Sequence, residues 1–499
     1  NVTNAARRFP VELLFALCGC LAATMLVEVQ DVNHMLARWV VRALVTANIG
    51  LLASLIASLV SESLGLRLPQ KSLFRVVAVL FSLGFFLLID PAERETDYVR
   101  FVLLSLALHL GISFVAFLRR NINGFWQFNK TLFLRFLAGG LYSFVLFAGL
   151  SAAIGSMNLL FGFEFEWDTF VILWIWIVGL FQTLFFLAGV PADLSALESD
   201  ESYPKGLKVF TQYVLIPLAS VYVLILLSYE LKIILQWKLP EGKVSNLILG
   251  YAVFGILSLL LIFPIRDRDE NKWIKTYSRS FYLLMLPLIG LLVVAVLARV
   301  LSYGVTVPRY FLLVLAAWLT FITLYFLVSK KQNIRVIPFS LALVTLATVY
   351  GPQDAFSISE RSQISVLKNL FRKYGSFDGR FLKPIDPTKV DSIDRERIRN
   401  VSSYVVSQFG LESLQKLVKP DLEKVKDSIR VNTKGLDLYR YSQRFREEEW
   451  LNKQYKIDQL YPPASDKAGV SIARVNGRDR AISLSGYRYM INLDNTQDS

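Results

Sequence analysis

The sequence predicts an all-α polytopic membrane domain followed by a small soluble α+β domain. Three observations predict this class: eleven apolar stretches fill residues 11–350, basic residues alternate between the connections, and the hydropathy pattern changes after Gly351. Hydrophobic residues make up 54% of the 499 residues, which is above the share of a typical soluble domain. Most of the chain is therefore expected to lie in a lipid bilayer.

Each apolar stretch is interpreted as a membrane-spanning helix because of its length. A hydrocarbon core of about 30 Å needs about 20 helical residues, and a helix satisfies every backbone polar group in lipid. Within each stretch, apolar residues lie on every side of the predicted helix instead of forming one stripe. This pattern argues against a soluble helical array. The third and eleventh stretches are short. The predicted spans are 11–29, 43–61, 73–89, 99–118, 132–156, 169–190, 209–228, 244–264, 281–301, 310–328 and 336–350.

The basic residues predict the orientation of these spans. Counted over alternate connections, one side carries 19 Lys and Arg residues and the other carries 9. The richer side includes the N-terminus and the connections 62–75, 119–135, 191–208, 265–280 and 329–335. Cytoplasmic connections carry the excess of positive charge. We therefore expect a cytoplasmic N-terminus and, after eleven spans, a C-terminal domain on the outer side of the membrane.

The domain boundary is predicted at Gly351-Pro352, giving a membrane domain over 1–351 and an exported domain over 352–499. Helical stripes follow over 358–374, 391–409, 411–425 and 438–454, with Gly375 as the cap of the first and Pro420 interrupting the third. Asn476-Gly477, flanked by residues 470–475 and 481–484, is typical of a β-hairpin, and 487–491 would add a third strand. The change of period is the reason for the α+β assignment.

Polar side chains inside spans are costly unless they are paired, so each is a candidate site. His109 lies in the middle of the fourth span. It could act as a proton relay or make a structural hydrogen bond to a neighbouring helix, and the structural bond is favoured. Asn48, Gln182 and Gln212 are favoured as hydrogen-bonding residues between helices. These four residues are the candidate intramembrane polar site.

The best local candidate is the block between the ninth and tenth spans. Gly304 and Pro308 break the helix there, and Arg299 and Arg309 flank the turn with Tyr303 and Tyr310. Two guanidinium groups can hold a phosphate or a carboxylate, either from a lipid headgroup or from the exported domain. A simple turn anchored by tyrosines and arginines at the interface explains the block as well and is favoured over a binding site.

No motif for a cofactor, a metal ion or a nucleotide stands out. The net charge of +14 does not indicate nucleic acid, because the basic residues are spread out and lack an interleaved aromatic patch. Asp31 and His34 lie in the first outer connection, the place of a catalytic acid in some membrane glycosyltransferases. That connection is too short to build such a site. We therefore expect no catalytic residue, cofactor or metal.

Two blocks of the chain resemble a known family. The first, at 203–237, contains Pro204, Lys205, Pro217, Tyr222, Tyr229 and Lys232; the second, at 299–318, contains Arg299, Tyr303, Gly304, Thr306, Arg309, Tyr310 and Trp318. They resemble the bacterial membrane proteins grouped as domain of unknown function 4153, in the form found in Bacteroidetes. The resemblance covers most of 130–375 and implies a multi-pass inner-membrane protein without an assigned activity.

These observations favour a non-enzymatic membrane scaffold or accessory subunit whose exported domain engages a protein partner of the envelope. The bilayer itself is the other expected partner. The alternative is a carrier for a lipid or small solute, which a cavity lined by His109 or Gln182 would favour. An enzyme acting on a lipid-linked substrate through Asp31 is a distant third.

Overall fold

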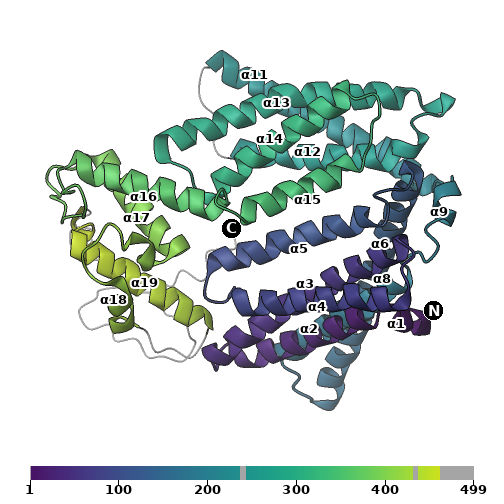
Figure 1. Ribbon diagram of the computed structural model, residues 1–499, viewed down its shortest axis with the longest axis horizontal. Helices are drawn as coiled ribbons and strands as arrows, with labels where there is room; N and C mark the ends of the chain where they lie inside the picture. Colours follow the sequence, from purple (N-terminus) through teal and green to yellow (C-terminus); the bar gives the residue numbers. More distant parts are fainter. Residues whose placement is uncertain (1, 237–242, 431–435, 461–499) are drawn as a thin grey trace.

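The computed structural model describes residues 2–236, 243–430 and 436–460 (Figure 1). In these ranges the regular elements are helices, and the pairing of Phe377 with Leu382 is an isolated bridge. The predicted strands at 470–475, 481–484 and 487–491 lie outside the described residues. The described part of the chain therefore supports an α-helical assignment, and the α+β assignment of the C-terminal part is not supported.

Ten helical segments of the described chain are long and apolar enough to cross a membrane. The eleventh predicted span forms a shorter helix, α15, over Val336–Val349. Its 14 residues correspond to about 21 Å at 1.5 Å per residue, less than a hydrocarbon core. The ten segments are Pro10–Val29, His34–Ser63, Leu68–Leu88, Glu95–Val115, Ile122–Phe161, Trp167–Ala188, Lys205–Gln236, Val244–Ile265, Asp269–Tyr303 and Val307–Val328.

Most of these segments are single helices, and two contain a π-helical turn. The helices are α2 (Pro10–Val29), α3 (His34–Ser63), α4 (Leu68–Leu88), α5 (Glu95–Val115), α6 (Ile122–Phe161), α12 (Lys243–Ile262), α13 (Trp273–Tyr303) and α14 (Val307–Val328). Between α7 (Trp167–Trp176) and α8 (Thr183–Ala188) lies η1 (Ile177–Gln182), and between α10 (Lys205–Phe210) and α11 (Ile216–Gln236) lies η2 (Thr211–Leu215). The short helices α1 (Val2–Arg8) and α9 (Ala196–Ser199) belong to connections.

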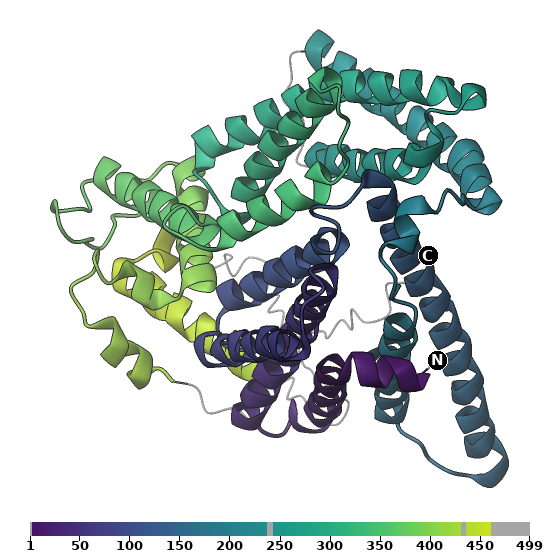
Figure 2. The same ribbon diagram turned by 45° about the vertical axis from the view of Figure 1, so that its right-hand side comes forward.

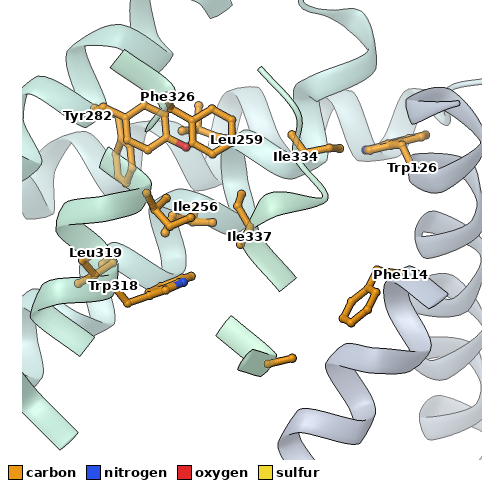
Figure 3. Packing of buried hydrophobic residues seen from close by; sticks show 14 of the residues in the cluster. Phe114, Trp126, Ile256, Leu259, Tyr282, Trp318, Leu319, Phe326, Ile334 and Ile337 are labelled. Carbon is orange, nitrogen blue, oxygen red and sulfur yellow. The ribbon is translucent and has the colours of Figure 1, made fainter. Parts of the chain in front are cut away.

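The membrane helices form two groups that meet along α5 and α15 (Figures 1 and 2). Helices α2 to α5 make up most of the first group, and α11 to α15 make up the second. Aromatic and branched side chains fill the second group (Figure 3). Tyr282 of α13 stacks on Phe326 of α14 with ring centroids 5.1 Å apart. Since lipid tails are as apolar as these side chains, close packing holds the helices together.

The connections at one end of the helices, which we call the basic end, are tied by arginines. Arg8 donates hydrogen bonds to both carboxylate oxygens of Glu62, at 2.8 and 2.6 Å, and to two backbone carbonyls of the α8–α9 connection. Arg335 donates to the carbonyls of Phe117 and Arg120, at 2.6 and 2.8 Å. These bonds join connections that are far apart in sequence and fix the basic end.

The C-terminal unit, residues 355–430 and 436–460, lies at the opposite end, which we call the docking end (Figure 1). It contains α16 (Ala355–Lys373), α17 (Ser392–Phe409), η5 (Leu411–Leu414), α18 (Leu422–Ser428), α19 (Leu436–Tyr455) and η6 (Asp458–Leu460). Its helices surround a separate core that includes Leu367, Phe371, Ile398 and Val405. Three predicted helices are confirmed, and so is the predicted interruption at Pro420 of the helix over 411–425, which forms two short helices. Pro420, which has no N–H to donate, separates η5 from α18.

Candidate functional site

The candidate site is built around the turn that joins α13 to α14 at the docking end. Gly304 ends α13 with φ +75° and ψ 175°, a backbone conformation that is almost restricted to glycine. Pro308 lies in the first turn of α14, where its missing N–H is not needed. The sequence therefore forces a sharp turn in which several backbone N–H and C=O groups have no partner in their own helices.

Side chains of α16 and α17 satisfy these backbone groups. Ser362 accepts a hydrogen bond from the N–H of Val305 at 2.8 Å, and Gln363 donates to the carbonyls of Tyr303 and Val305 at 3.0 Å. The Tyr404 hydroxyl accepts from the N–H of Val307 at 2.8 Å. Ser359 donates to the Val305 carbonyl at 3.3 Å. We call the four side chains Ser359, Ser362, Gln363 and Tyr404 the turn clamp; all of them are uncharged at neutral pH.

The structure brings together three of the four residues predicted to contact an anion. Arg309 donates to the carbonyl of Gly304 at 2.8 Å, and its guanidinium carbon lies 5.7 Å from the ring centroid of Tyr303. Arg299 is close enough for its like charge to act on Arg309, and it makes no hydrogen bond or ion pair with the described residues. Tyr310 turns away and donates to the carbonyl of Gln353 at 2.6 Å.

Sequence reasoning missed a third arginine, Arg397 of α17. Its guanidinium donates to the carbonyl of Ser302 at 2.6 Å and also lies 5.7 Å from the Tyr303 ring centroid. One nitrogen lies 3.3 Å from Asp394, while the buried Nε has no hydrogen-bond partner in the described part of the chain. The pattern of 391–409 predicted a helix, but it contained no signal that Arg397 faces the membrane helices.

A second contact joins the C-terminal unit to the start of α5. Arg444 of α19 forms an ion pair with Glu95 at 3.0 Å, and Arg100 lies over the Phe356 ring at 5.2 Å. A cavity of about 250 Å³ lies at this contact, and charged residues of the α4–α5 connection, of α5 and of the C-terminal unit line it. Burial raises the pKa of Glu447 in its wall, although the nearby Lys426 opposes this effect. We call this region the charged contact.

A smaller cavity of about 180 Å³ lies beside the charged contact and includes His34 and Arg38 in its wall. Asp31, the candidate acid of the enzyme hypothesis, is exposed in the connection just before α3. On the neighbouring connection, Asp90 is buried and accepts hydrogen bonds from Arg38 and Arg42. These ion pairs hold the α4–α5 connection against α3. In the described residues, no group of three or more His, Cys, Asp and Glu residues is placed to hold a metal ion.

The four intramembrane candidates do not form one site. The Ser105 hydroxyl donates to Asn48 at 2.9 Å, and His109 bonds the carbonyl of Ser105 in its own helix at 2.8 Å. Gln182 lies in η1 and packs near Gly139 of α6, and Gln212 lies in η2. Only Asn48 and His109 are therefore linked, through Ser105, and both cavities described above lie at the docking end instead.

Comparison with known proteins identifies a family that the chain matches over most of its length. The model of the family described as "Domain of unknown function (DUF4153)" matches residues 15–396. An uncharacterised protein of Pasteurella multocida (strain Pm70) is 25% identical over 266 residues, which are 49% of this chain and 44% of that protein. The chain thus spans less than half the length of this curated relative. No solved structure matches the chain.

Proposed function

Because the chain belongs to the family described as a domain of unknown function (DUF4153), whose name specifies no activity, we propose its function from the geometry. We propose a non-enzymatic scaffold of the bacterial inner membrane that holds its C-terminal unit in a fixed position for a partner protein. The turn clamp is the observation that supports this proposal. Four side chains bind backbone groups of one turn, so the C-terminal unit is attached in one orientation.

The charge distribution supports a periplasmic position for this unit. The connections of the basic end belong to the set with 19 Lys and Arg residues, and such sets are cytoplasmic. The docking end then faces the periplasm. A cysteine in place of the exposed Asp427 should react with a membrane-impermeant maleimide in intact spheroplasts, whereas one in place of the exposed Lys272 should not. The reverse pattern would overturn the orientation.

An exposed aromatic pair on α19 supports a protein partner. The exposed fractions of Tyr441 and Phe445 are 74% and 58%, and residues four positions apart lie on the same helix face. Exposed aromatic side chains are enriched where proteins bind each other. The carrier alternative would need a path lined by His109 or Gln182, and the two cavities at the docking end do not provide one.

Photo-crosslinking in intact cells tests the scaffold proposal. A benzoylphenylalanine in place of Tyr441 or Phe445 should give a discrete protein adduct, and the same residue in place of the exposed Lys424 should not. Gly304→Ala, introduced together with the Tyr441 probe, should reduce the adduct because it disturbs the turn clamp. Equal adducts from the Lys424 probe, or an adduct that ignores Gly304→Ala at matched membrane levels, would contradict the proposal.

A further inference from the structure

We propose that Arg299, Arg309 and Arg397 together bind the phosphate of a lipid headgroup at the docking end. The three residues come from both parts of the chain: Arg299 from α13, Arg309 from α14 and Arg397 from α17. The guanidinium carbons of Arg309 and Arg397 both lie 5.7 Å from the ring centroid of Tyr303. Arg299 lies four residues before Tyr303 in α13, so the two side chains lie on the same face of that helix. Two cationic groups therefore lie beside one tyrosine, and a third lies on the same helix as that tyrosine.

Negative charge from the described residues does not balance this cluster. Asp394 is 3.3 Å from Arg397, but it also pairs with Lys373. The Arg309 contact is with a neutral backbone carbonyl. Arg299 makes neither a hydrogen bond nor an ion pair within the described ranges. Like charges repel strongly where water is partly excluded, so an arrangement of this kind is stabilised when an anion binds between the arginines.

The donor geometry points to an oxyanion. The buried Nε of Arg397 has no partner among the described residues, and a buried donor without an acceptor costs about 1–3 kcal/mol. Guanidinium groups match phosphate oxygens with two parallel N–H donors. A phosphate placed here would satisfy Arg397 and neutralise part of the charge on Arg299 and Arg309. One phosphate thus supplies both the acceptor that Arg397 lacks and the negative charge that the arginines lack.

The depth of the cluster identifies the source of the phosphate. Arg299 lies in the last turns of α13, where a long side chain reaches the bilayer interface. Tyr303, at the same helix end, is half exposed, and tyrosine is enriched at the level of the headgroups. A lipid phosphate is therefore available at this depth without any opening of the bundle. Its binding would link α13 and α14 to the C-terminal unit through Arg397.

Thermal unfolding of the full chain in a neutral maltoside detergent tests this inference. Added dioleoylphosphatidylglycerol should raise the unfolding midpoint, whereas dioleoylglycerol, which lacks the phosphate, should not. Arg299→Gln should weaken the apparent lipid affinity by about tenfold or more, since it removes a donor without breaking a bond between described residues. Arg299→Lys should weaken it too, because an ammonium group lacks the guanidinium fork.

Arg279→Gln is the matched control, because Arg279 is an exposed arginine near the opposite end of α13. It should leave the apparent affinity within about twofold of the wild type, as expected for a surface residue away from the site. Equal losses from Arg279→Gln and Arg299→Gln would overturn the site. An equal rise with dioleoylglycerol would do the same. An Arg299-dependent rise with inorganic phosphate alone would overturn the lipid as its source.

Discussion

The turn clamp and the charged contact attach the same C-terminal unit to the membrane helices by different physics. The turn clamp uses uncharged side chains that bind backbone groups of one turn. The charged contact uses side chains of opposite charge, such as Arg444 and Glu95, that are partly exposed. Hydrogen bonds to buried backbone are directional and insensitive to salt, while exposed ion pairs are weak and screened.

This difference shows which contact fixes the orientation of the C-terminal unit. A backbone turn offers donors and acceptors in one geometry, so the turn clamp accepts one arrangement of α16 and α17. Long charged side chains can satisfy each other in many arrangements. We therefore expect the turn clamp to determine orientation and most of the attachment energy, and the charged contact to tune its strength.

Gly304→Ala should have the largest effect on the attachment. A Cβ at Gly304 would lie 2.9 Å from the side chains of both Gln363 and Val366, and the backbone there has φ +75°. Strain of this kind costs about 1–3 kcal/mol, and loss of the turn-clamp hydrogen bonds adds to it. We expect a lower unfolding midpoint and faster proteolysis between the membrane helices and the C-terminal unit.

Gly410→Ala is the control for this change. Gly410 has a similar backbone, with φ 82° and ψ 162°, but a Cβ there would meet the flexible end of Glu412. Gly410→Ala should lower the unfolding midpoint through backbone strain, but it should not speed proteolysis between the membrane helices and the C-terminal unit. Equal proteolysis of the two variants would show that the turn clamp does not carry the attachment.

Asp394→Asn should have the next largest effect, and this effect should depend on pH. Burial alone would raise the pKa of Asp394, but hydrogen bonds from Lys373 and Tyr374 hold it below its ordinary value of 3.8. The ionised form therefore stabilises the fold above pH 3.8, and this contribution is lost as the pH falls below that value.

At pH 7 we expect Asp394→Asn to cost about 1–3 kcal/mol, because it leaves charged donors without their acceptor. Unfolding of the wild type and the variant, followed between pH 3 and pH 8, should converge at the acid end. The turn clamp, with its uncharged side chains, should show no such dependence in the same range. A difference in unfolding free energy that stays constant across this pH range would contradict the stabilising role of the ionised Asp394.

Tyr404→Phe should remove one bond of the turn clamp, the bond that the hydroxyl accepts from the N–H of Val307. The expected loss is about 1 kcal/mol of unfolding free energy. Tyr441→Phe removes an exposed hydroxyl from α19 and should change the free energy little. If both variants unfold like the wild type, the hydroxyl of Tyr404 does not contribute to the attachment.

Arg444→Gln should have the smallest effect, below about 1 kcal/mol. The reason is that the side chains of Arg444 and Glu95 are 29% and 40% exposed. The difference should disappear at 1 M salt, where the Debye length is about 3 Å. Arg446→Gln on the same helix is the control and should not alter the salt dependence. A salt-independent loss would place Arg444 among the structural residues instead.

Local sequence patterns predicted the helices well because hydropathy and helix ends are properties of neighbouring residues. They also located the turn at Gly304 and the proximity of Arg299, Tyr303 and Arg309, which follow from one helix break. They did not find Arg397 or the turn clamp, because these depend on contacts between residues about 55 to 100 positions apart. The break of 411–425 at Pro420 was predicted as well, because a proline inside a helix removes a backbone hydrogen bond.

The length of α6 has a consequence for the surrounding lipid. Its 40 residues end at Phe161, and its last basic residue is Arg135. The apolar part after Arg135 measures about 39 Å at 1.5 Å per residue, against a hydrocarbon thickness of about 30 Å. The helix must tilt by about 40° or the bilayer must thicken locally, at a modest cost per ångström of mismatch. The tilt of α6 is therefore expected to depend on the thickness of the surrounding membrane.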